Sequence, residues 1–356
     1  ADGSVTSTST WTVSANTSVT ASERAVINGQ TYRLIADGPL AGRWIRTGAG
    51  SSRALIDRLA GADRYATAAA ISAASYEPGV PVAYLATGLD FPDALVAGPA
   101  AAKLGGPILL TRPDAVPQAI VDELTRLKPQ RIVLVGSAAV VGEAVAATAA
   151  KLAPTVTRLA GRDRYATAAA VSAATFQPGI PVVYLATGLN FPDALGGGAA
   201  AARGGGTVLL VSTASIPSST AAELSRLRPA RIVILGSSGV VSDTVLTVAR
   251  AYAPSVSRLA GRDRYATAVA ISQATFGMLT TARAFVAVGT AFPDGLTISA
   301  VAGRASAPVL LVPKTSLPPS VASELQRLGP DRVTIAGSSA GAVSEGVAAS
   351  IRNLWP

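Results

Sequence analysis

The stretch R-L-A-G-A-D-R-Y-A-T-A at Arg58–Ala68 is the most informative part of this sequence, because it recurs with one position changed at Arg158–Ala168 and Arg258–Ala268. A second motif, F-P-D-x-L, keeps step with it at Phe91–Leu95, Phe191–Leu195 and Phe292–Leu296. Two motifs that repeat in phase define a structural unit, so we predict three domains of about one hundred residues. Three near-identical copies favour a binding protein, which gains avidity from several weak sites, over an enzyme.

The apolar runs of each repeat predict its fold. In the first repeat, apolar strands at 82–86, 107–110 and 131–136 alternate with helical stretches at 64–74, 92–104, 117–127 and 143–152. Strands that are apolar throughout and alternate with helices indicate a parallel sheet covered on both faces. The predicted fold class is α/β: three tandem, small, doubly wound (Rossmann-like) domains at 53–156, 157–256 and 257–356. Val156–Leu159 is interpreted as the opening strand of the second repeat, and short connections between repeats imply that the domains pack together.

Residues 1–52 differ from the repeats. Short alternating segments at Thr10–Ser14, Tyr32–Ile35 and Arg43–Ile45, with a turn at Asn28-Gly29, predict a small β-rich module. Its G-x-W ending loosely resembles a bacterial SH3-like wall-targeting module. The alternative is a strand-rich linker docked on the first repeat.

Composition excludes several classes of protein. The chain has no cysteine and no histidine, which rules out disulfides, thiolate catalysis and imidazole ligands, and we expect no metal and no cofactor. No apolar run reaches the roughly 18–20 residues of a membrane span. The start at Ala1-Asp2-Gly3 lacks an initiator Met, as expected if a leader or pro-segment has been removed or the chain has been trimmed. A Cys-free, Ser/Thr-rich chain fits an exported bacterial protein.

The net charge of +9 favours an anionic partner. The second and third repeats carry most of it: residues 157–256 hold eight Lys or Arg against four Asp or Glu, and residues 257–356 hold nine against five. No basic cluster accompanies this excess and aromatic residues are only 5% of the chain, so we do not expect nucleic acid to be the partner.

The strand ends carry the candidate ligand-binding residues. In a doubly wound sheet, ligands bind at the carboxyl ends of the strands, where both motifs are expected to lie. Helix N-termini there could hold a phosphate or carboxylate, with the guanidinium groups of Arg64, Arg164 and Arg264 adding charge-assisted hydrogen bonds. The alternative is structural: Asp63, Asp163 and Asp263 cap helices, and each neighbouring Arg pairs with an F-P-D aspartate, namely Asp93, Asp193 or Asp294. Thr67 and its equivalents either face the crevice or bond back within the helix.

We identify no catalytic residue. The recurring carboxylates each have an Arg nearby in the motif, which is expected to hold them ionised and make them poor general acids. The run Gly204-Gly205-Gly206 precedes a strand instead of opening a helix, so it is not a phosphate loop.

Taken together, R-L-A-G-x-D-R-Y-A-T-A, the segment A-T-G-L-D-F-P-D-A-L, G-G-P-I-L-L-T and R-I-V-L-V-G resemble the cell wall binding repeat 2 family, which occurs as three tandem copies in Gram-positive surface proteins. The resemblance covers residues 53–356. It implies a secreted or surface-located, non-covalent anchor to anionic wall polysaccharide or a teichoic-type polymer. It also implies a pseudo-threefold arrangement of the three domains, and we expect a monomer.

The resemblance also links polymer contact to the P-I-L-L segment. In this chain the segment is Pro107, Ile108, Leu109 and Leu110 in the first repeat, with Thr207 and Val208 opening it in the second and Pro308 and Val309 in the third. A further difference is Ala62, where the other repeats have Arg162 and Arg262. The three sites are therefore not expected to be equivalent.

Two other hypotheses stay open. The chain could modulate a cell-wall hydrolase, as an amidase enhancer does, or it could be a structural surface-layer or assembly protein.

Overall fold

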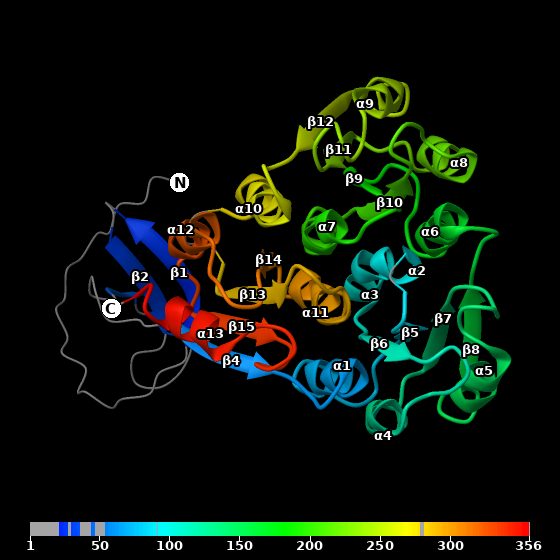
Figure 1. Ribbon diagram of the computed structural model, residues 1–356, viewed down its shortest axis with the longest axis horizontal. Helices are drawn as coiled ribbons and strands as arrows, with labels where there is room; N and C mark the ends of the chain where they lie inside the picture. The colour runs from blue at the N-terminus through cyan, green and yellow to red at the C-terminus, as the bar shows by residue number, and fades with distance from the viewer. Residues whose placement is uncertain are drawn as a thin grey trace.

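The computed structural model describes residues 21–27, 30–35, 44–46, 54–90, 92–277 and 281–355. Three α/β lobes surround a central group of helices (Figure 1). Each lobe contains one four-stranded parallel sheet that alternates with helices, which confirms the predicted fold class.

The N-terminal module contains a three-stranded antiparallel sheet in the order β1-β2-β3. Its strands are Ala21–Ile27 (β1), Gln30–Ile35 (β2) and Trp44–Arg46 (β3). The strands predicted at Tyr32–Ile35 and Arg43–Ile45 fall on β2 and β3, apart from Arg43. The strand predicted at Thr10–Ser14 and the turn at Asn28-Gly29 lie outside the described residues. Strand β1 was not predicted, because consecutive polar residues interrupt its alternation.

The first repeat forms a sheet in the order β6-β5-β7-β8. Its elements are α1 (Arg64–Ala73), β5 (Ala83–Thr87), α2 (Pro92–Leu95), α3 (Ala97–Leu104), β6 (Ile108–Thr111), α4 (Gln118–Leu127), β7 (Arg131–Val135), α5 (Glu143–Ala149) and β8 (Thr155–Leu159). All strand pairs are parallel. The two central strands are buried on both faces, because helices cover both sides of the sheet.

The other two repeats follow the same plan. The second contains α6 (Arg164–Ala173), β9 (Val182–Thr187), α7 (Pro192–Arg203), β10 (Thr207–Val211), α8 (Ser218–Leu227), β11 (Arg231–Leu235), α9 (Asp243–Ala249) and β12 (Ser255–Leu259), with the sheet order β10-β9-β11-β12. The third contains α10 (Arg264–Thr275), β13 (Arg283–Val288), α11 (Pro293–Arg304), β14 (Val309–Val312), α12 (Pro319–Leu328), β15 (Arg332–Ala336) and α13 (Glu345–Arg352). Its sheet has the order β14-β13-β15-β4, where β4 is Leu55–Leu59.

The first repeat differs from the other two in one helix. The predicted helix at 92–104 is divided into α2 and α3, whereas α7 and α11 are continuous. The cause is Pro99, which has no N–H to donate to the carbonyl of Leu95 and whose ring clashes with that carbonyl. Helix α2 ends at Leu95, and the second and third repeats have Ala199 and Ala300 in the place of Pro99.

Each sheet takes its last strand from the stretch that opens the next repeat. Strand β8 pairs with β7 and β12 pairs with β11, although α6 and α10, which follow these strands, pack on the next sheets. The boundaries predicted near 156 and 256 therefore fall inside β8 and β12. The division into domains at 53–156, 157–256 and 257–356 stays a prediction.

The ring of repeats is closed by β4. Strand β4 pairs in parallel with β15, in the place that β8 and β12 take in the other sheets, so the start of the first repeat completes the sheet of the third. Asp57 and Arg332 form an ion pair at 2.9 Å across this junction. Arg58 donates to the Gly337 carbonyl oxygen at 2.8 Å and pairs with Glu345 of α13 at 2.9 Å. The closing contact is thus non-covalent, whereas β8 and β12 follow directly from α5 and α9.

Helices α3, α7 and α11 meet at the centre of the ring (Figure 1). Small residues line their contacts. A Cβ at Gly303 would lie 2.7 Å from the Cβ of Ala202 and 2.9 Å from that of Ala102, and a Cβ at Gly98 would lie 2.7 Å from Ser299 Oγ. Such close approach of the backbones explains the Gly- and Ala-rich sequences of these helices.

A cation from each central helix reaches the next repeat. Lys103 lies 4.9 Å above the ring centroid of Phe176, and Arg203 lies 5.4 Å above that of Phe276. Arg304 lies 5.3 Å above the ring of Tyr76, which carries the same contact from the third repeat back to the first. These cation–π pairs confirm that the domains pack against each other, as the short connections predict.

Candidate functional site

The G-x-D-R turn joins one sheet to the next. Asp63 caps α1 by accepting hydrogen bonds from the N–H groups of Tyr65 (3.0 Å) and Ala66 (2.8 Å). The N–H of Gly61 donates to Thr67 Oγ1 at 3.0 Å. In the other repeats Asp163 and Asp263 each cap their helix by accepting from one N–H group, that of Ala166 or Ala266, and the turn bond recurs at Thr167 and Thr267.

These contacts decide two predictions made for this turn. The capping role of the three aspartates is confirmed. Each carboxylate accepts from N–H groups at the start of its helix. These are the groups that the ligand-binding hypothesis assigned to a phosphate. The hydroxyl oxygen of Thr67 accepts from the N–H of Gly61, in the turn that precedes the helix, so of the two alternatives for this threonine the bond within the helix is not the one that this contact supports.

The arginine of the turn holds the loop that follows the central strand. Arg64 donates to the carbonyl oxygen of Gly88, Arg164 donates to that of Gly188 at 2.5 Å, and Arg264 to that of Gly289 at 2.6 Å. Arg64 is exposed, and the other two are partly exposed. Each arginine therefore has a structural contact inside its own repeat and reaches the surface as well.

The F-P-D aspartates lie at the point where the strand order of each sheet reverses. A Cβ at Gly136, after β7, would lie 2.8 Å from a carboxylate oxygen of Asp93, and a Cβ at Gly236 would lie 2.5 Å from one of Asp193. Both glycines have positive φ, so the turn and the close carboxylate favour glycine there. In other doubly wound sheets this crevice holds the ligand.

In this protein the start of the next repeat reaches into that crevice. Thr167 of α6 forms a hydrogen bond with Asp93, and Arg164 acts on the same carboxylate through its charge. Arg264 acts in this way on Asp193, and Arg64 acts on Asp294. The Arg of each repeat is therefore electrostatically coupled to the aspartate of the preceding repeat around the ring. The predicted pairing of Arg64 with Asp93, inside one repeat, is therefore replaced by a pairing of Arg64 with Asp294 of the preceding repeat.

Burial changes the ionisation of these aspartates. It raises the pKa of Asp193 to about 6 against the pull of Arg264, and it raises that of Asp294 to about 6 against the pull of Arg64. It also raises the pKa of Asp93, which the Thr167 hydrogen bond and the Arg164 charge oppose. The nearby Arg does not lower the pKa of these carboxyl groups below its ordinary value, because the loss of hydration outweighs the attraction.

Arg162 and Arg262 lie on the surface beside the capping aspartates. Their side chains are 76% and 78% exposed, and they pair with Asp163 and Asp263 at 3.5 and 3.4 Å. Arg162 also donates to Ser218 Oγ at 3.2 Å. Both side chains are open to a polymer, and their role in binding stays a prediction.

The P-I-L-L segments lie inside the sheets. Ile108, Leu109 and Leu110 belong to β6 and are at most 1% exposed, and Pro107 is buried with them. Thr207 and Val208 of β10, and Pro308 and Val309 beside and in β14, are buried as well. These side chains are covered by helices, so the segment can influence binding only by shaping the strand end that follows it.

Sequence reasoning missed the first arginine of R-L-A-G. Arg158 donates to the carbonyl oxygens of Gly136 (3.1 Å) and Val141 (2.6 Å) and pairs with Glu143 at 2.9 Å. Arg258 repeats this with Gly236 (2.7 Å) and Asp243 (2.9 Å). The sequence feature that could have indicated this ion pair is the acidic residue at the start of the last helix in every repeat.

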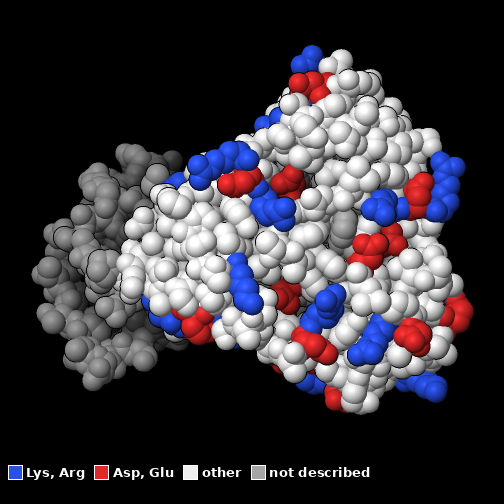
Figure 2. Space-filling model, viewed as in Figure 1, with Lys and Arg blue, Asp and Glu red and all other residues white. Residues whose placement is uncertain are grey.

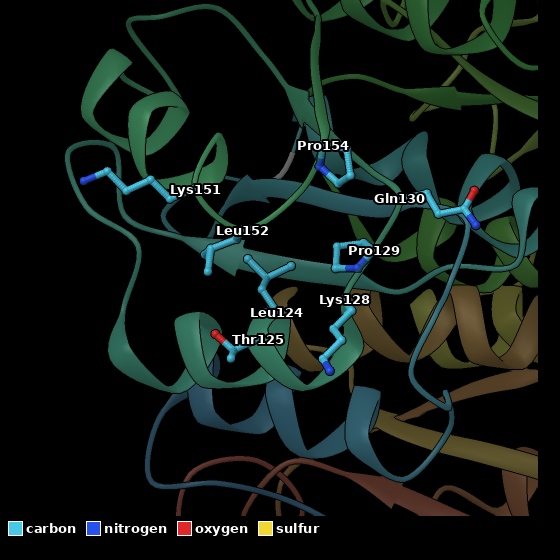
Figure 3. A pocket seen from close by; sticks show the side chains of 8 residues that line it. All are labelled: Leu124, Thr125, Lys128, Pro129, Gln130, Lys151, Leu152 and Pro154. Carbon is cyan, nitrogen blue, oxygen red and sulfur yellow. The ribbon is translucent and has the colours of Figure 1, made fainter.

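Lys, Arg, Asp and Glu side chains are dispersed over the visible face, with both signs often adjacent (Figure 2). A pocket of about 390 Å³ lies away from the junctions, between the end of α4 and the start of β8 (Figure 3). Its lining residues are Leu124, Thr125, Lys128, Pro129, Gln130, Lys151, Leu152 and Pro154. Lys151 points away from the apolar centre formed by Leu124 and Leu152, so the two lysines do not converge on one ligand position.

The described part of the chain has neither a membrane-spanning helix nor a cluster of metal-ligating side chains. None of its helices combines the length and the apolar character that crossing a bilayer requires. Within the same residues, no three Asp or Glu side chains are grouped as metal ligands.

Comparisons with known proteins place these features in context. The family model described as Cell wall binding domain 2 (CWB2) matches residues 58–146, 158–246 and 258–348. The N-acetylmuramoyl-L-alanine amidase LytC of Bacillus subtilis (strain 168) is 27% identical over 256 residues, which cover 72% of this chain and 50% of the amidase. The amidase enhancer of the same organism is 28% identical over 308 residues, which cover 85% of this chain and 40% of that protein. This chain thus spans half or less of the length of these relatives.

Two solved structures share the fold. Cwp6 from Clostridium difficile superimposes with a TM-score of 0.78 at 22% identity, covering 95% of this chain and 51% of Cwp6. Cwp8 from the same organism superimposes with a TM-score of 0.75 at 22% identity, covering 85% of this chain and 52% of Cwp8. At this identity the likeness concerns the fold alone.

Proposed function

Because the chain belongs to the Cell wall binding domain 2 (CWB2) family, with three repeats that imply a cell-surface location, we propose that it is a non-catalytic, non-covalent anchor. Its ligand is an anionic polymer of a Gram-positive cell wall, either a teichoic-type polymer or an acidic polysaccharide. The observation that carries this proposal is the set of basic residues repeated at the junctions of the three repeats. The family to which these repeats belong is described as a cell wall binding family.

The positions of these arginines support an extended ligand. Arg64 is exposed at the first G-x-D-R turn, and Arg162 and Arg262 project from the other two. A polymer that touches two or three turns gains affinity through effective concentration even when each contact is weak. Arginine also suits phosphate and carboxylate groups, which it can bind with two parallel hydrogen bonds.

The absence of catalysis belongs to the same proposal. The titratable groups that repeat at the strand ends are Asp93, Asp193 and Asp294, and the next repeat contacts each of them through charge or hydrogen bonds. A general acid must reach a reacting atom of its substrate. Carboxylates enclosed at a domain junction are better placed to hold the repeats together than to act as general acids.

The test is sedimentation of the protein with purified Gram-positive walls before and after acid removal of their anionic polymers. We expect binding to intact walls and loss of binding to stripped walls. Equal binding to both would overturn the proposal, because peptidoglycan would then be the ligand.

Similarity to the amidase enhancer favours one second candidate, modulation of a wall hydrolase. The protein would then change the rate at which an amidase digests walls that have already lost their anionic polymers. An unchanged rate under these conditions would reject the second candidate.

A further inference from the structure

The strands of all three sheets point toward one face of the molecule. Helix α6 begins at Arg164, which acts on Asp93 after β5 and donates to the Gly188 carbonyl after β9. The chain leaves α6 at Phe176, whose ring lies under Lys103 at the C-terminal end of α3. Helices α10 and α1 make equivalent contacts at the other junctions. The ring therefore has a carboxyl-end face, with the G-x-D-R turns, and an opposite face at the strand starts, which we call the amino-end face.

The amino-end face of the first two repeats carries six cations. They lie at the C-terminal ends of α4, α5, α8 and α9 and at the starts of β7 and β11, and they are Lys128, Arg131, Lys151, Arg228, Arg231 and Arg250. In the part of the chain that the structure describes, none of the six forms an ion pair. All four acidic residues of the second repeat are occupied elsewhere, in a helix cap, a junction or an ion pair. The fold thus gathers on one face cations that are dispersed in the sequence.

The amino-end face of the third repeat is more nearly neutral. Arg332 pairs with Asp57 of β4 at 2.9 Å, and Arg352 lies 4.0 Å from Glu345 of its own helix. The strand that closes the ring therefore brings a carboxylate to the cations of this repeat. A count of charges by repeat hides this difference, because the second and third repeats have the same net charge.

Two of these cations occupy a backbone conformation that favours glycine. Lys128 and Arg228 have φ values of 47° and 45°, in the left-handed region, and the third repeat has Gly329 at the same position with a φ of 50°. A residue with a side chain is less stable in this conformation than glycine is. Both side chains are exposed, so packing does not explain the choice of residue. The first two repeats thus keep a cation at the expense of backbone strain, which indicates a role outside folding.

In the first repeat two of the cations flank an apolar groove. The pocket of about 390 Å³ between α4 and β8 opens on this face, with Leu124 and Leu152 at its centre and Lys128 and Lys151 among its lining residues (Figure 3). None of its lining residues is acidic. Because Lys151 points away from the centre, the two lysines are placed to meet successive groups of an extended chain rather than one small anion.

We propose that the amino-end face of the first two repeats is a second binding site, whose ligand is an extended polyanion that contacts cations of both repeats. The inference rests on the anchor function proposed above and adds a site opposite the G-x-D-R turns. Unpaired cations on two neighbouring repeats favour a long ligand, since each exposed charge contact is weak and several together give avidity. The third repeat contributes little to this site, because its cations have carboxylate partners.

The first experiment uses the strained positions, where binding and stability should change in opposite directions. The double variant Lys128→Gly/Arg228→Gly removes two cations and relieves the backbone. We expect it to bind purified Gram-positive walls about fivefold more weakly, from the loss of two exposed charge contacts, and to melt at or above the wild-type temperature. If the cations served only to stabilise the C-terminal ends of their helices, the variant would melt lower and bind as wild type, which would overturn the inference.

Two matched controls separate backbone from charge and one face from the other. Ser306→Gly relieves a third non-glycine residue of positive φ, 50°, without removing a charge, and it should bind as wild type. Arg112→Gln/Lys314→Gln removes two exposed cations that follow β6 and β14 on the carboxyl-end face. We expect less than about twofold loss from this pair, since it lowers only the overall charge. A loss as large as that of Lys128→Gly/Arg228→Gly would show that net charge, and not the amino-end face, determines binding.

A second ligand distinguishes failure of this site from failure of the anchor function. All variants are also measured on long-chain polyphosphate, a polyanion free of wall components, and we expect the same order of affinities as on walls. Wild type that binds polyphosphate through Lys128 and Arg228 but does not bind walls would reject the anchor function and keep the site. Lys128→Gly/Arg228→Gly that binds both ligands as wild type would overturn the site and leave the anchor function intact. Wild type that binds neither ligand would overturn both.

Discussion

Asp193 shows how a single residue can connect two repeats and respond to pH. Its pKa in the folded protein is about 6, above the roughly 3.9 of an unfolded aspartate, so the folded state binds more protons between these values. Stability contributed by this group is therefore full below about pH 4 and falls as pH rises through 6. The same sign holds for Asp294.

We expect the variant Asp193→Asn/Asp294→Asn to lose this part of the pH dependence. In wild type, the two groups make unfolding easier at pH 7.5 than at pH 5, by roughly 1–2 kcal/mol after allowance for solvent screening. Thermal melts at both pH values measure the difference. Asp243→Asn, on an exposed ion pair with Arg258, is the control and should keep the wild-type difference. A double variant with an unchanged difference would show that these carboxylates do not titrate as argued.

Arg64 has a structural contact, whereas Arg162 is almost fully exposed. Arg64→Ala leaves the Gly88 carbonyl without its partner, and we expect a loss of about 1–2 kcal/mol of stability. Arg264→Ala should cost about the same, because it breaks the equivalent bond to Gly289. Arg162→Ala should leave the melting temperature unchanged and weaken only wall binding. Denaturant unfolding and wall sedimentation on the same three variants measure both effects, and unchanged stability of Arg64→Ala would contradict the structural role.

At the scale of elements, β4 closes the ring of repeats. It supplies the edge strand of the third sheet while α1, which follows it, packs on the first. This strand pairs in parallel with β15, and it carries the Asp57–Arg332 ion pair and the Arg58 contacts. Its removal would expose β15 as an edge strand, and exposed edges invite pairing with another chain.

We therefore expect deletion of residues 1–59 to destabilise the third repeat and to produce dimers or aggregates. Deletion of residues 1–52 is the matched control, because it keeps β4. Light scattering after size-exclusion chromatography measures the mass, and calorimetry measures the unfolding. A monomeric protein of wild-type stability after the longer deletion would show that β4 is dispensable.

The elements also show how far sequence reasoning reached. Apolar periodicity gave the strands, the helices and the parallel sheets, because those features depend on local pattern. It could not assign β8 to the preceding sheet, since a strand's own residues do not identify its neighbour. The P-I-L-L segment is a similar case. Its apolar character predicts a buried strand, which the structure has, whereas its link to polymer contact came from family resemblance. The division of the helix at Pro99 was not predicted, because it depends on the clash of one proline ring. The raised pKa values of the aspartates were not predicted, because they depend on burial in the folded protein.

For the whole molecule, the excess of positive charge predicts sensitivity to salt. The second and third repeats together carry +8. Attraction to an anionic polymer is screened over about 10 Å at 0.1 M salt, so we expect wall binding to weaken steadily as salt is raised. Sedimentation from about 0.05 to 1 M sodium chloride measures this. Binding that is constant over the range would mean that hydrogen bonds and shape, rather than charge, hold the polymer.

The non-covalent closure by β4 has a consequence for the order of the repeats. Because β4 occupies the place of β8 and β12, the closed ring has no intrinsic first or last repeat. A circular permutant should therefore fold, with new termini cut between α5 and β8 near residue 153 and a linker joining residue 355 to residue 54. In that protein β4 is tethered to the end of the third repeat and β8 becomes the closing strand. If the wall contacts are as proposed, the permutant binds walls with wild-type affinity, and the point at which an attached domain leaves the ring can be moved from one junction to another.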